Sequence, residues 1–164
     1  MSKKHPIIAV TGSSGAGTSI AKSAFMYIFR RNGINPAIID GDCFHRYDRS
    51  EMDKLSAEAE KKGDHLTHFG PEGNLFEELE KVFIEYGEKG TGKKRFYIHD
   101  EKEASEHGNP PGTLTSWEPI ENNTDLLFYE GLHGGLVTNK INVAKHVDLL
   151  IGVRPIIKLE WRQK

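Results

Sequence analysis

The sequence predicts an α/β fold with a mostly parallel sheet and helices on both faces. Short apolar runs rich in β-branched residues, typical of buried strands, alternate with stretches whose apolar residues recur at helical spacing. Glycines and charged residues directly follow several of these runs, which is where a parallel sheet gathers its ligand-binding side chains. The chain has 164 residues, the length of one domain, so residues 1–164 are expected to form a single unit.

The predicted elements follow one another in a regular order. The strands, each a short apolar run, are residues 7–10, 36–40, 125–129 and 148–153. Helical spacing predicts one helix from Ala21 to Phe29, with a stop at Asn32-Gly33, and another from Leu75 to Tyr86. Weaker patterns favour a helix over 48–62, a strand over 95–99, loops over 63–72 and 108–112, and the start of a helix over 156–164.

Composition narrows the class of protein. A net charge of −2 gives no electrostatic reason to expect nucleic acid or an acidic membrane surface as a partner. The single cysteine, Cys43, excludes an intrachain disulfide and is expected to be a small buried apolar residue. No apolar run approaches the roughly 20 residues of a membrane span. The expectation is a cytoplasmic protein with no membrane partner.

The segment from Ile7 to Ser19 is the most informative part of the chain. An apolar strand candidate runs into a glycine-rich turn that matches the phosphate-binding pattern G-x-x-x-x-G-K-[ST], except that Thr18 replaces the lysine. The backbone N–H groups of such a turn, with the helix N-terminus that follows, bind phosphate. Ser19 stands where a hydroxyl ligates Mg²⁺. The predicted ATP-binding residues are Gly12, Ser13, Ser14, Gly15, Ala16, Gly17, Thr18 and Ser19.

Two other interpretations of this turn stay open. One is a glycine-rich turn that binds no ligand. The other is a dinucleotide-binding turn, whose G-x-G-x-x-G pattern needs a glycine where Ser14 stands. That pattern also expects an acidic residue about 20 residues further on, and Asp40 ends the next predicted strand.

Carboxylates follow the second and third predicted strands. Asp42 lies one glycine beyond the second strand, where it is placed to accept a proton from an acceptor hydroxyl. Glu130 follows the third strand and resembles the acidic residue that assists Mg²⁺ in phosphate-loop enzymes. The alternative for each is a structural role at a turn or helix start. Parallel strands bring these residues to the edge that carries the phosphate loop.

Basic residues beside Asp42 indicate a polar, anionic acceptor. His45, Arg46 and Arg49 make up this group, and Arg49 is able to hold a phosphate bidentately. His65 and His68 are three apart but are expected to face solvent rather than to hold a metal ion. Weaker candidates for acceptor contacts are His133, Tyr97 and His99.

Three segments together resemble the phosphoribulokinases of the bacterial type. They are Gly-Ser-Ser-Gly-Ala-Gly-Thr-Ser at 12–19, Asp-Gly-Asp-Cys-Phe-His-Arg-Tyr at 40–47 and Phe-Tyr-Glu-Gly-Leu-His-Gly-Gly at 128–135. Phe-Ile-Glu-Tyr-Gly at 83–87 and Leu-Glu-Trp-Arg-Gln-Lys at 159–164 are similar too. The resemblance extends over the whole chain, and threonine in the lysine position of the phosphate loop is usual in that family.

The resemblance implies a P-loop kinase fold and a specific reaction. The reaction is transfer of the γ-phosphoryl group of ATP to the C1 hydroxyl of ribulose 5-phosphate, which gives the bisphosphate of the Calvin cycle. By resemblance, Asp42 is the general base, Glu130 and Ser19 lie at Mg²⁺, and Lys164 is a catalytic cation near the transferred phosphoryl group. His45 and Arg49 are the implied sugar-phosphate contacts.

The same resemblance implies features of the whole family protein. Members of this type form large homo-oligomers and respond to NADH and AMP, and Arg31 matches a position tied to that regulation. Family chains continue beyond the position of Lys164 with an arginine–aspartate pair, a further substrate arginine and a mobile lid, so the domain is expected to be truncated at its C-terminus. Two alternatives remain, a nucleotide-binding fragment without catalysis and a uridine kinase-like P-loop kinase.

Overall fold

A four-stranded parallel sheet forms the centre of the molecule. The computed structural model describes residues 4–154. In space the strands follow the order β2-β5-β1-β6. They are β1 (Ile7–Gly12), β2 (Pro36–Asp40), β5 (Leu126–Gly131) and β6 (Leu149–Val153). All four strands predicted from the apolar runs are therefore confirmed, and so is the predicted α/β class.

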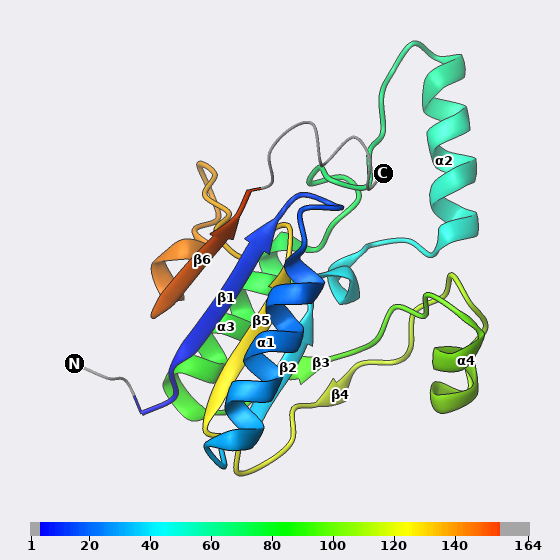
Figure 1. Cartoon of the computed structure of the whole chain (residues 1–164). Helices are drawn as coiled ribbons and strands as arrows, with labels where there is room; N and C mark the ends of the chain where they lie inside the picture. Colours follow the sequence, from blue (N-terminus) through cyan, green and yellow to red (C-terminus); the bar gives the residue numbers. More distant parts are fainter. Residues whose placement is uncertain (1–3, 155–164) are drawn as a thin grey trace.

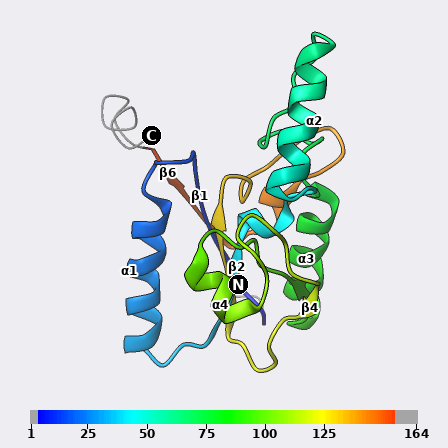
Figure 2. The same ribbon diagram turned by 90° about the vertical axis from the view of Figure 1, so that its right-hand side faces the viewer.

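Helices cover both faces of this sheet, as predicted. Helix α1 lies on one face and α3 on the other, while α2 stands away from the body of the molecule (Figure 1, Figure 2). The elements outside the central sheet are α1 (Thr18–Arg31), η1 (Gly41–Phe44), α2 (Arg49–Lys61), α3 (Phe76–Lys89), β3 (Lys93–Lys94), α4 (Glu101–His107), β4 (Glu118–Pro119) and η2 (Val143–His146).

Alternating side chains of the strands build two cores. On β5, Phe128 faces α1 and packs against Phe29 with 5.6 Å between ring centroids. Its neighbour Tyr129 faces α3 and packs against Phe83 at 5.5 Å. Because successive side chains of a strand point to opposite faces, one buried strand serves both cores. This anchors β5 in the middle of the sheet, with its carboxyl end at the site described below.

One predicted strand is absent, and one short helix was not predicted. Residues 95–99 do not form a strand, since Tyr97 makes only an isolated bridge with Leu114 and the regular pairing is limited to the short antiparallel pair of β3 and β4. Helix α4 was not predicted, because its seven residues are almost all polar and show no apolar stripe. The stripe of α1 is only partly buried, with Ala24 exposed and Ile28 46% exposed.

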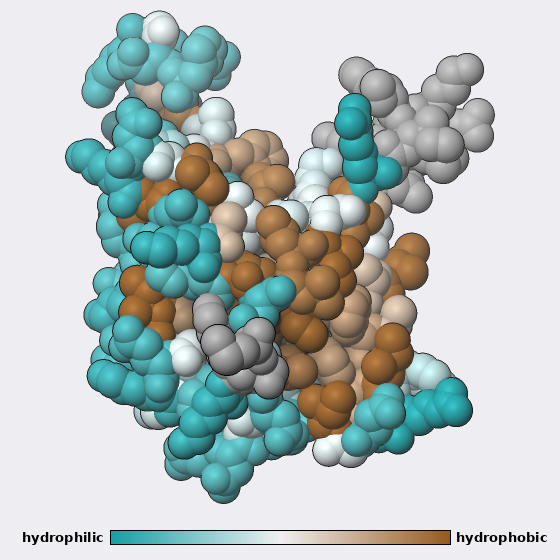
Figure 3. Space-filling model, turned by 90° about the vertical axis from the view of Figure 1, so that its left-hand side faces the viewer, coloured by the Kyte–Doolittle hydropathy of each residue, from teal (hydrophilic) through white to brown (hydrophobic). Residues whose placement is uncertain are grey.

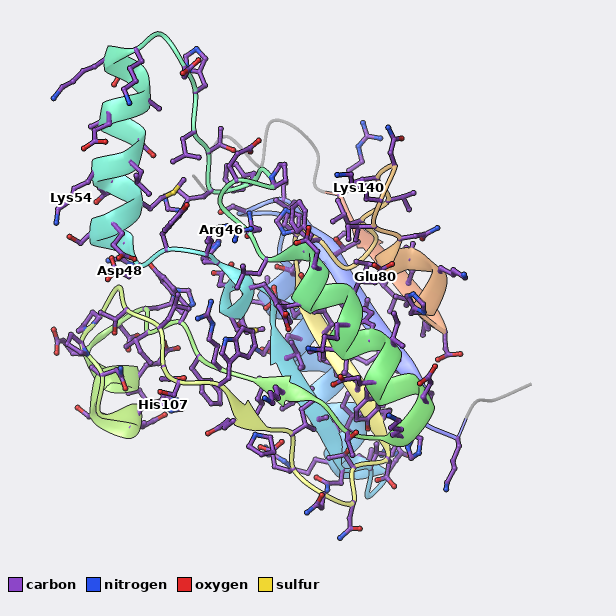
Figure 4. All side chains as sticks on the ribbon, turned by 180° about the vertical axis from the view of Figure 1, so that it is seen from behind. Arg46, Asp48, Lys54, Glu80, His107 and Lys140 are labelled. Carbon is purple, nitrogen blue, oxygen red and sulfur yellow. The ribbon has the colours of Figure 1, made fainter. Side chains whose placement is uncertain are left out.

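The other surfaces of the sheet are unevenly covered. Apolar side chains gather over the β6 side of the molecule (Figure 3), where Leu149 is 48% and Leu150 45% exposed. On the α3 face of the sheet, Glu80 of α3 faces the η2 turn (Figure 4) and accepts a hydrogen bond from the Asn142 N–H at 2.8 Å. Within residues 4–154, no helix is both long and apolar enough to cross a bilayer.

Candidate active site

The phosphate loop joins β1 to α1 and leaves the start of the helix open. Gly17 is the N-cap of α1 with φ +95°, a left-handed conformation that glycine adopts without strain. No side chain caps this helix, and its first turn carries no acidic residue. The N–H groups of the first turn and the positive end of the helix dipole therefore face the loop, as an anion site requires.

The turn after β2 places Asp42. Asp40 caps the short η1 helix, because its Oδ1 accepts a hydrogen bond from the Asp42 N–H at 3.1 Å. From the far side, the Arg95 guanidinium donates to the Cys43 carbonyl at 2.8 Å and to the His45 carbonyl. The turn is thus fixed on both sides, with Cys43 buried beneath it as expected.

The turns that carry Asp42 and Glu130 cross in close contact. A Cβ atom on Gly41 would lie 2.6 Å from the Tyr129 hydroxyl, and one on Gly131 would lie 2.8 Å from the Cα of Gly41. The Tyr129 hydroxyl also accepts a hydrogen bond from the His133 N–H at 3.3 Å. Glycine is needed at both crossing positions because no side chain fits between the two backbones.

These turns and the phosphate loop enclose one cleft of about 430 Å³. Among the described residues, its lining includes the carboxylates of Asp40, Asp42 and Glu130 but neither lysine nor arginine. Parallel strand ends bring these groups together from distant parts of the chain. The predicted site residues that line the cleft are Gly12, Ser13, Ser14, Gly15, Thr18, Ser19, Asp42, His45, His99, Glu130 and His133.

The two candidate catalytic carboxylates have opposite electrostatics. The hydrogen bond from His45 holds the pKa of Asp42 below its usual value, aided by the charges of His45 and His99 and opposed by burial. His45 Nε2 lies 3.4 Å from Asp42 Oδ1. Burial raises the pKa of Glu130, while the Thr18 hydroxyl and Lys22 act against that rise. Asp42 is therefore suited to stay ionised. Glu130 is the carboxylate whose ionised form a nearby cation would stabilise more strongly.

Asn74 orients His45 and was missed from the sequence. Its amide nitrogen donates to the carbonyls of His68 at 2.6 Å and Gly70 at 2.9 Å, so its oxygen faces His45 Nδ1 at 3.1 Å. The ring of His45 is then turned with Nε2 toward Asp42. No local sequence pattern indicates this role, because Asn74 lies 29 positions along the chain from His45.

Other predicted residues lie at the margin of the cleft. The Arg49 Nε donates to the Tyr97 hydroxyl at 3.3 Å, and the Tyr97 ring contacts His45 and His99 at 5.5 Å and 5.0 Å between centroids. Neither Arg49 nor Tyr97 lines the cleft itself. His68 is exposed, as expected, but lines the cleft, 5.7 Å from His45 between ring centroids.

Four further predicted residues within the described range, Arg46, Arg31, Ala16 and Gly17, do not line the cleft. Arg46 does not face an acceptor, because its guanidinium donates to the carbonyls of Glu72 and Asn74 and fastens the 63–75 loop (Figure 4). Arg31 is exposed at the end of α1, away from the cleft. Ala16 and Gly17 shape the phosphate loop without lining the cleft, and Lys164 lies outside the described residues.

Comparison with known proteins identifies relatives over the whole chain. A model of the phosphoribulokinase/uridine kinase family matches residues 7–164. A phosphoribulokinase of Nitrobacter vulgaris is 58% identical over 165 residues, and a probable phosphoribulokinase of Escherichia coli K12 is 56% identical over 164. Each match covers 100% of this chain and 57% of the relative, so the chain spans little more than half the length of these curated relatives.

Solved structures show the same relationship. The structure of phosphoribulokinase from Rhodobacter spheroides matches with a TM-score of 0.87 and 47% identity, over 99% of this chain and 55% of that one. A possible uridine kinase from Bacillus stearothermophilus matches with a TM-score of 0.61 over 100% of this chain and 78% of that one. At 12% identity the second match shows the fold alone. The resemblance drawn from the motifs and the P-loop kinase fold are both confirmed.

Proposed function

The chain belongs to the phosphoribulokinase/uridine kinase family, and we propose that its site transfers the γ-phosphoryl group of ATP to the C1 hydroxyl of ribulose 5-phosphate. The observation that carries this proposal is the single cleft in which Asp42 and Glu130 face the phosphate loop. Phosphoryl transfer needs a cradle for the donor phosphates, a group that helps to hold the metal ion, and a group that orients the attacking oxygen. The phosphoribulokinase relatives support a sugar phosphate as the acceptor.

In the proposed reaction, Asp42 takes the proton of the acceptor hydroxyl. The hydroxyl oxygen then forms a bond to the γ-phosphorus as the bond from that phosphorus to the bridging oxygen breaks, and ADP leaves. The lowered pKa of Asp42 keeps the carboxylate ionised and ready to accept. His45, held by Asn74, keeps the carboxylate in place.

The donor side is suited to Mg²⁺–ATP. A serine hydroxyl and a carboxylate are the oxygen ligands that Mg²⁺ takes alongside substrate phosphates, and Ser19 and Glu130 both line the cleft. Bound Mg²⁺ would neutralise charge on the β- and γ-phosphates. Since the described lining holds no lysine or arginine, a catalytic cation has to come from elsewhere, and we assign that role to Lys164.

The acceptor side is rich in imidazole. His45, His99 and His133 line the cleft near Asp42, and we assign them contacts to the sugar phosphate. Arg49 contacts Tyr97, which packs against His45, and we assign Arg49 and Tyr97 contacts to the sugar phosphate as well.

Properties of the whole protein form part of the same proposal. We propose a cytoplasmic homo-oligomer, a P-loop kinase domain that extends past residue 164, and regulation by NADH and AMP through Arg31. The exposed position of Arg31 on the last turn of α1 leaves it open to an effector or a neighbouring subunit. Asp40 is already engaged by Lys22 and the Asp42 N–H, which argues against the alternative of a dinucleotide turn.

The test is a product assay with two acceptors. ³¹P NMR would follow ATP, Mg²⁺ and either ribulose 5-phosphate or uridine in the presence of the protein. We expect ADP and a second phosphate ester on the sugar, with uridine untouched. Transfer to uridine alone would favour the uridine kinase alternative. Binding of Mg²⁺–ATP without transfer to either acceptor would favour a nucleotide-binding fragment.

A further inference from the structure

Lys22 lies behind the cleft and touches two of its three carboxylates. It follows Ser19 by three positions on α1, so it lies about one turn beyond the phosphate loop. Its Nζ lies 3.3 Å from Asp40 Oδ2 and 3.9 Å from Glu130 Oε2. One ammonium group therefore joins the strand ends of β2 and β5.

Asp40 extends this link to the backbone of Asp42. While Oδ2 of Asp40 faces Lys22, Oδ1 accepts the hydrogen bond from the Asp42 N–H at 3.1 Å. An unbroken series of polar contacts thus runs from Glu130 through Lys22 and Asp40 to Asp42. It connects the donor side of the cleft with the acceptor side.

Lys22 is not placed as a substitute for the lysine missing from the phosphate loop. It does not line the site cleft but lines a neighbouring one of about 400 Å³, together with Ile38 and Phe96. Its side chain is 30% exposed, while that of Glu130 is 11% exposed. The ammonium group therefore contacts these carboxylates from outside the cleft that holds the phosphate loop.

The ammonium group offsets the repulsion between two of these carboxylates. Asp40 and Glu130 repel each other at the edge of the sheet, and the shared ammonium is what lets both carboxylates point inward. If Asp40 rotated toward solvent, the Asp42 N–H would lose its acceptor and the η1 turn its cap. Asp42 would then lose its fixed distance from the γ-phosphate.

We infer that Lys22 is a positioning residue that fixes the Asp42 turn and Glu130 in one geometry. The inference rests on the proposed function, because it assigns Lys22 a part in aligning acceptor and donor. It predicts that Lys22 affects the turnover step more than the binding of either substrate, since a small misplacement of reacting groups lowers the rate while the contacts that bind each substrate remain.

Two measurements on the purified protein test this inference. In Lys22→Met, we expect the Asp42 amide hydrogen to exchange about tenfold faster while amides of β1 and β5 keep their protection. We also expect kcat to fall by about tenfold to a hundredfold with little change in the KM for ATP. Lys22→Arg should restore both, because a guanidinium reaches the same two carboxylates. Lys81→Met, which removes an exposed ion pair with Glu78 on α3, is the matched control and should change neither.

The inference and the proposed function fail separately. Unchanged exchange of the Asp42 amide in Lys22→Met would overturn the role of Lys22, whatever the protein phosphorylates. A rise in the KM for ATP in proportion to the fall in kcat would overturn it too. So would a failure of Lys22→Arg to restore the kcat and the amide exchange. If the unaltered protein phosphorylates only uridine, the proposed acceptor is wrong, while the amide exchange still decides the role of Lys22.

Discussion

The lowered pKa of Asp42 depends more on His45 than on any other neighbouring side chain. The hydrogen bond from His45 is the largest cause of its lowered pKa, and Asn74 sets the angle of the imidazole that makes it. Burial works in the opposite direction. Loss of this partner would therefore raise the pH below which Asp42 becomes protonated.

His45→Ala should move the acid limb of the pH–rate profile to higher pH. The pKa of Asp42 in the folded protein lies below its ordinary value of 3.8, so removal of the lowering contact raises it. Because the Asp42 side chain is 48% exposed, we expect a shift of less than about one pH unit. The pH dependence of kcat/KM measures it. His65→Ala, at an exposed position in the 63–75 loop, should leave the limb where it is, and an unmoved limb in His45→Ala would contradict the assignment.

Thr18 has a use that its place in the motif does not reveal. Its hydroxyl interacts with the Glu130 carboxylate and opposes the rise of the Glu130 pKa. Thr18→Val keeps the shape and removes the donor, so that pKa should rise further. Mg²⁺–ATP affinity should then fall by roughly threefold to tenfold, with a larger loss at pH 6 than at pH 8, because a higher pKa favours protonation of Glu130 as the pH falls. Isothermal titration calorimetry at the two pH values measures this, with Thr18→Ser as the variant that keeps the donor.

At the scale of elements, the site depends on how closely two turns cross. The backbones after β2 and β5 meet at Gly41 and Gly131 above the Tyr129 hydroxyl. This contact keeps Asp42 and Glu130 on neighbouring strand ends facing one loop. It explains why each carboxylate is adjacent to a glycine in the sequence.

Gly41→Ala should separate the two turns. The new Cβ would lie 2.6 Å from the Tyr129 hydroxyl, a contact that requires the backbone to move. We expect a loss of about 1–3 kcal/mol in the free energy of unfolding, measured by urea denaturation, and lower turnover. Gly152→Ala on β6 is the control, because a Cβ there meets no atom within 4 Å. Equal stability of the two variants would show that the crossing is looser than described.

The sequence predicted some elements well for physical reasons. The four strands were found because each is an apolar run, and parallel pairing buries the central one on both faces, as in Leu126–Gly131. The 95–99 segment was assigned wrongly because its aromatic residues are typical of a strand. In the structure, Tyr97 makes only an isolated bridge, and its ring packs against His45 of the site. Helix α4 was not predicted because it buries no residue and so has no apolar stripe in its sequence.

At the scale of the whole molecule, apolar side chains are exposed on the outer side of β6. Leu149 and Leu150 are nearly half exposed there. An apolar patch on an edge strand favours association (Figure 3). We expect the 164-residue chain to associate in a concentration-dependent way.

Leu149→Lys should reduce that association. The side chain is 48% exposed, so a lysine costs little in stability but disrupts an apolar contact. Sedimentation velocity over a range of concentrations measures the change. Tyr27→Lys, at a 64% exposed position on α1, is the control and should leave association as it was. Equal effects of both variants would place the contact elsewhere.

The parts of the site that sequence reasoning missed share one property. Lys22, Asn74 and Arg95 contact residues of the 40–45 segment from 18 to 52 positions away along the chain. Spacing in the sequence indicates which residues share a strand end, and so Asp42 and Glu130 were found. It does not indicate which lysine, amide or guanidinium holds them, since that depends on the packing of separate segments.

The central claim is that Asp42 is the base of a phosphoryl-transfer site whose ATP cradle is a separate part of the cleft. Asp42→Asn tests it most directly, with turnover and ATP affinity measured on the same preparation. Turnover should fall by about 10²- to 10⁴-fold while the Kd for Mg²⁺–ATP stays within about twofold. Asp64→Asn, at an exposed loop position, should change neither. Loss of ATP affinity in step with turnover, or turnover that persists without the carboxylate, would contradict the account.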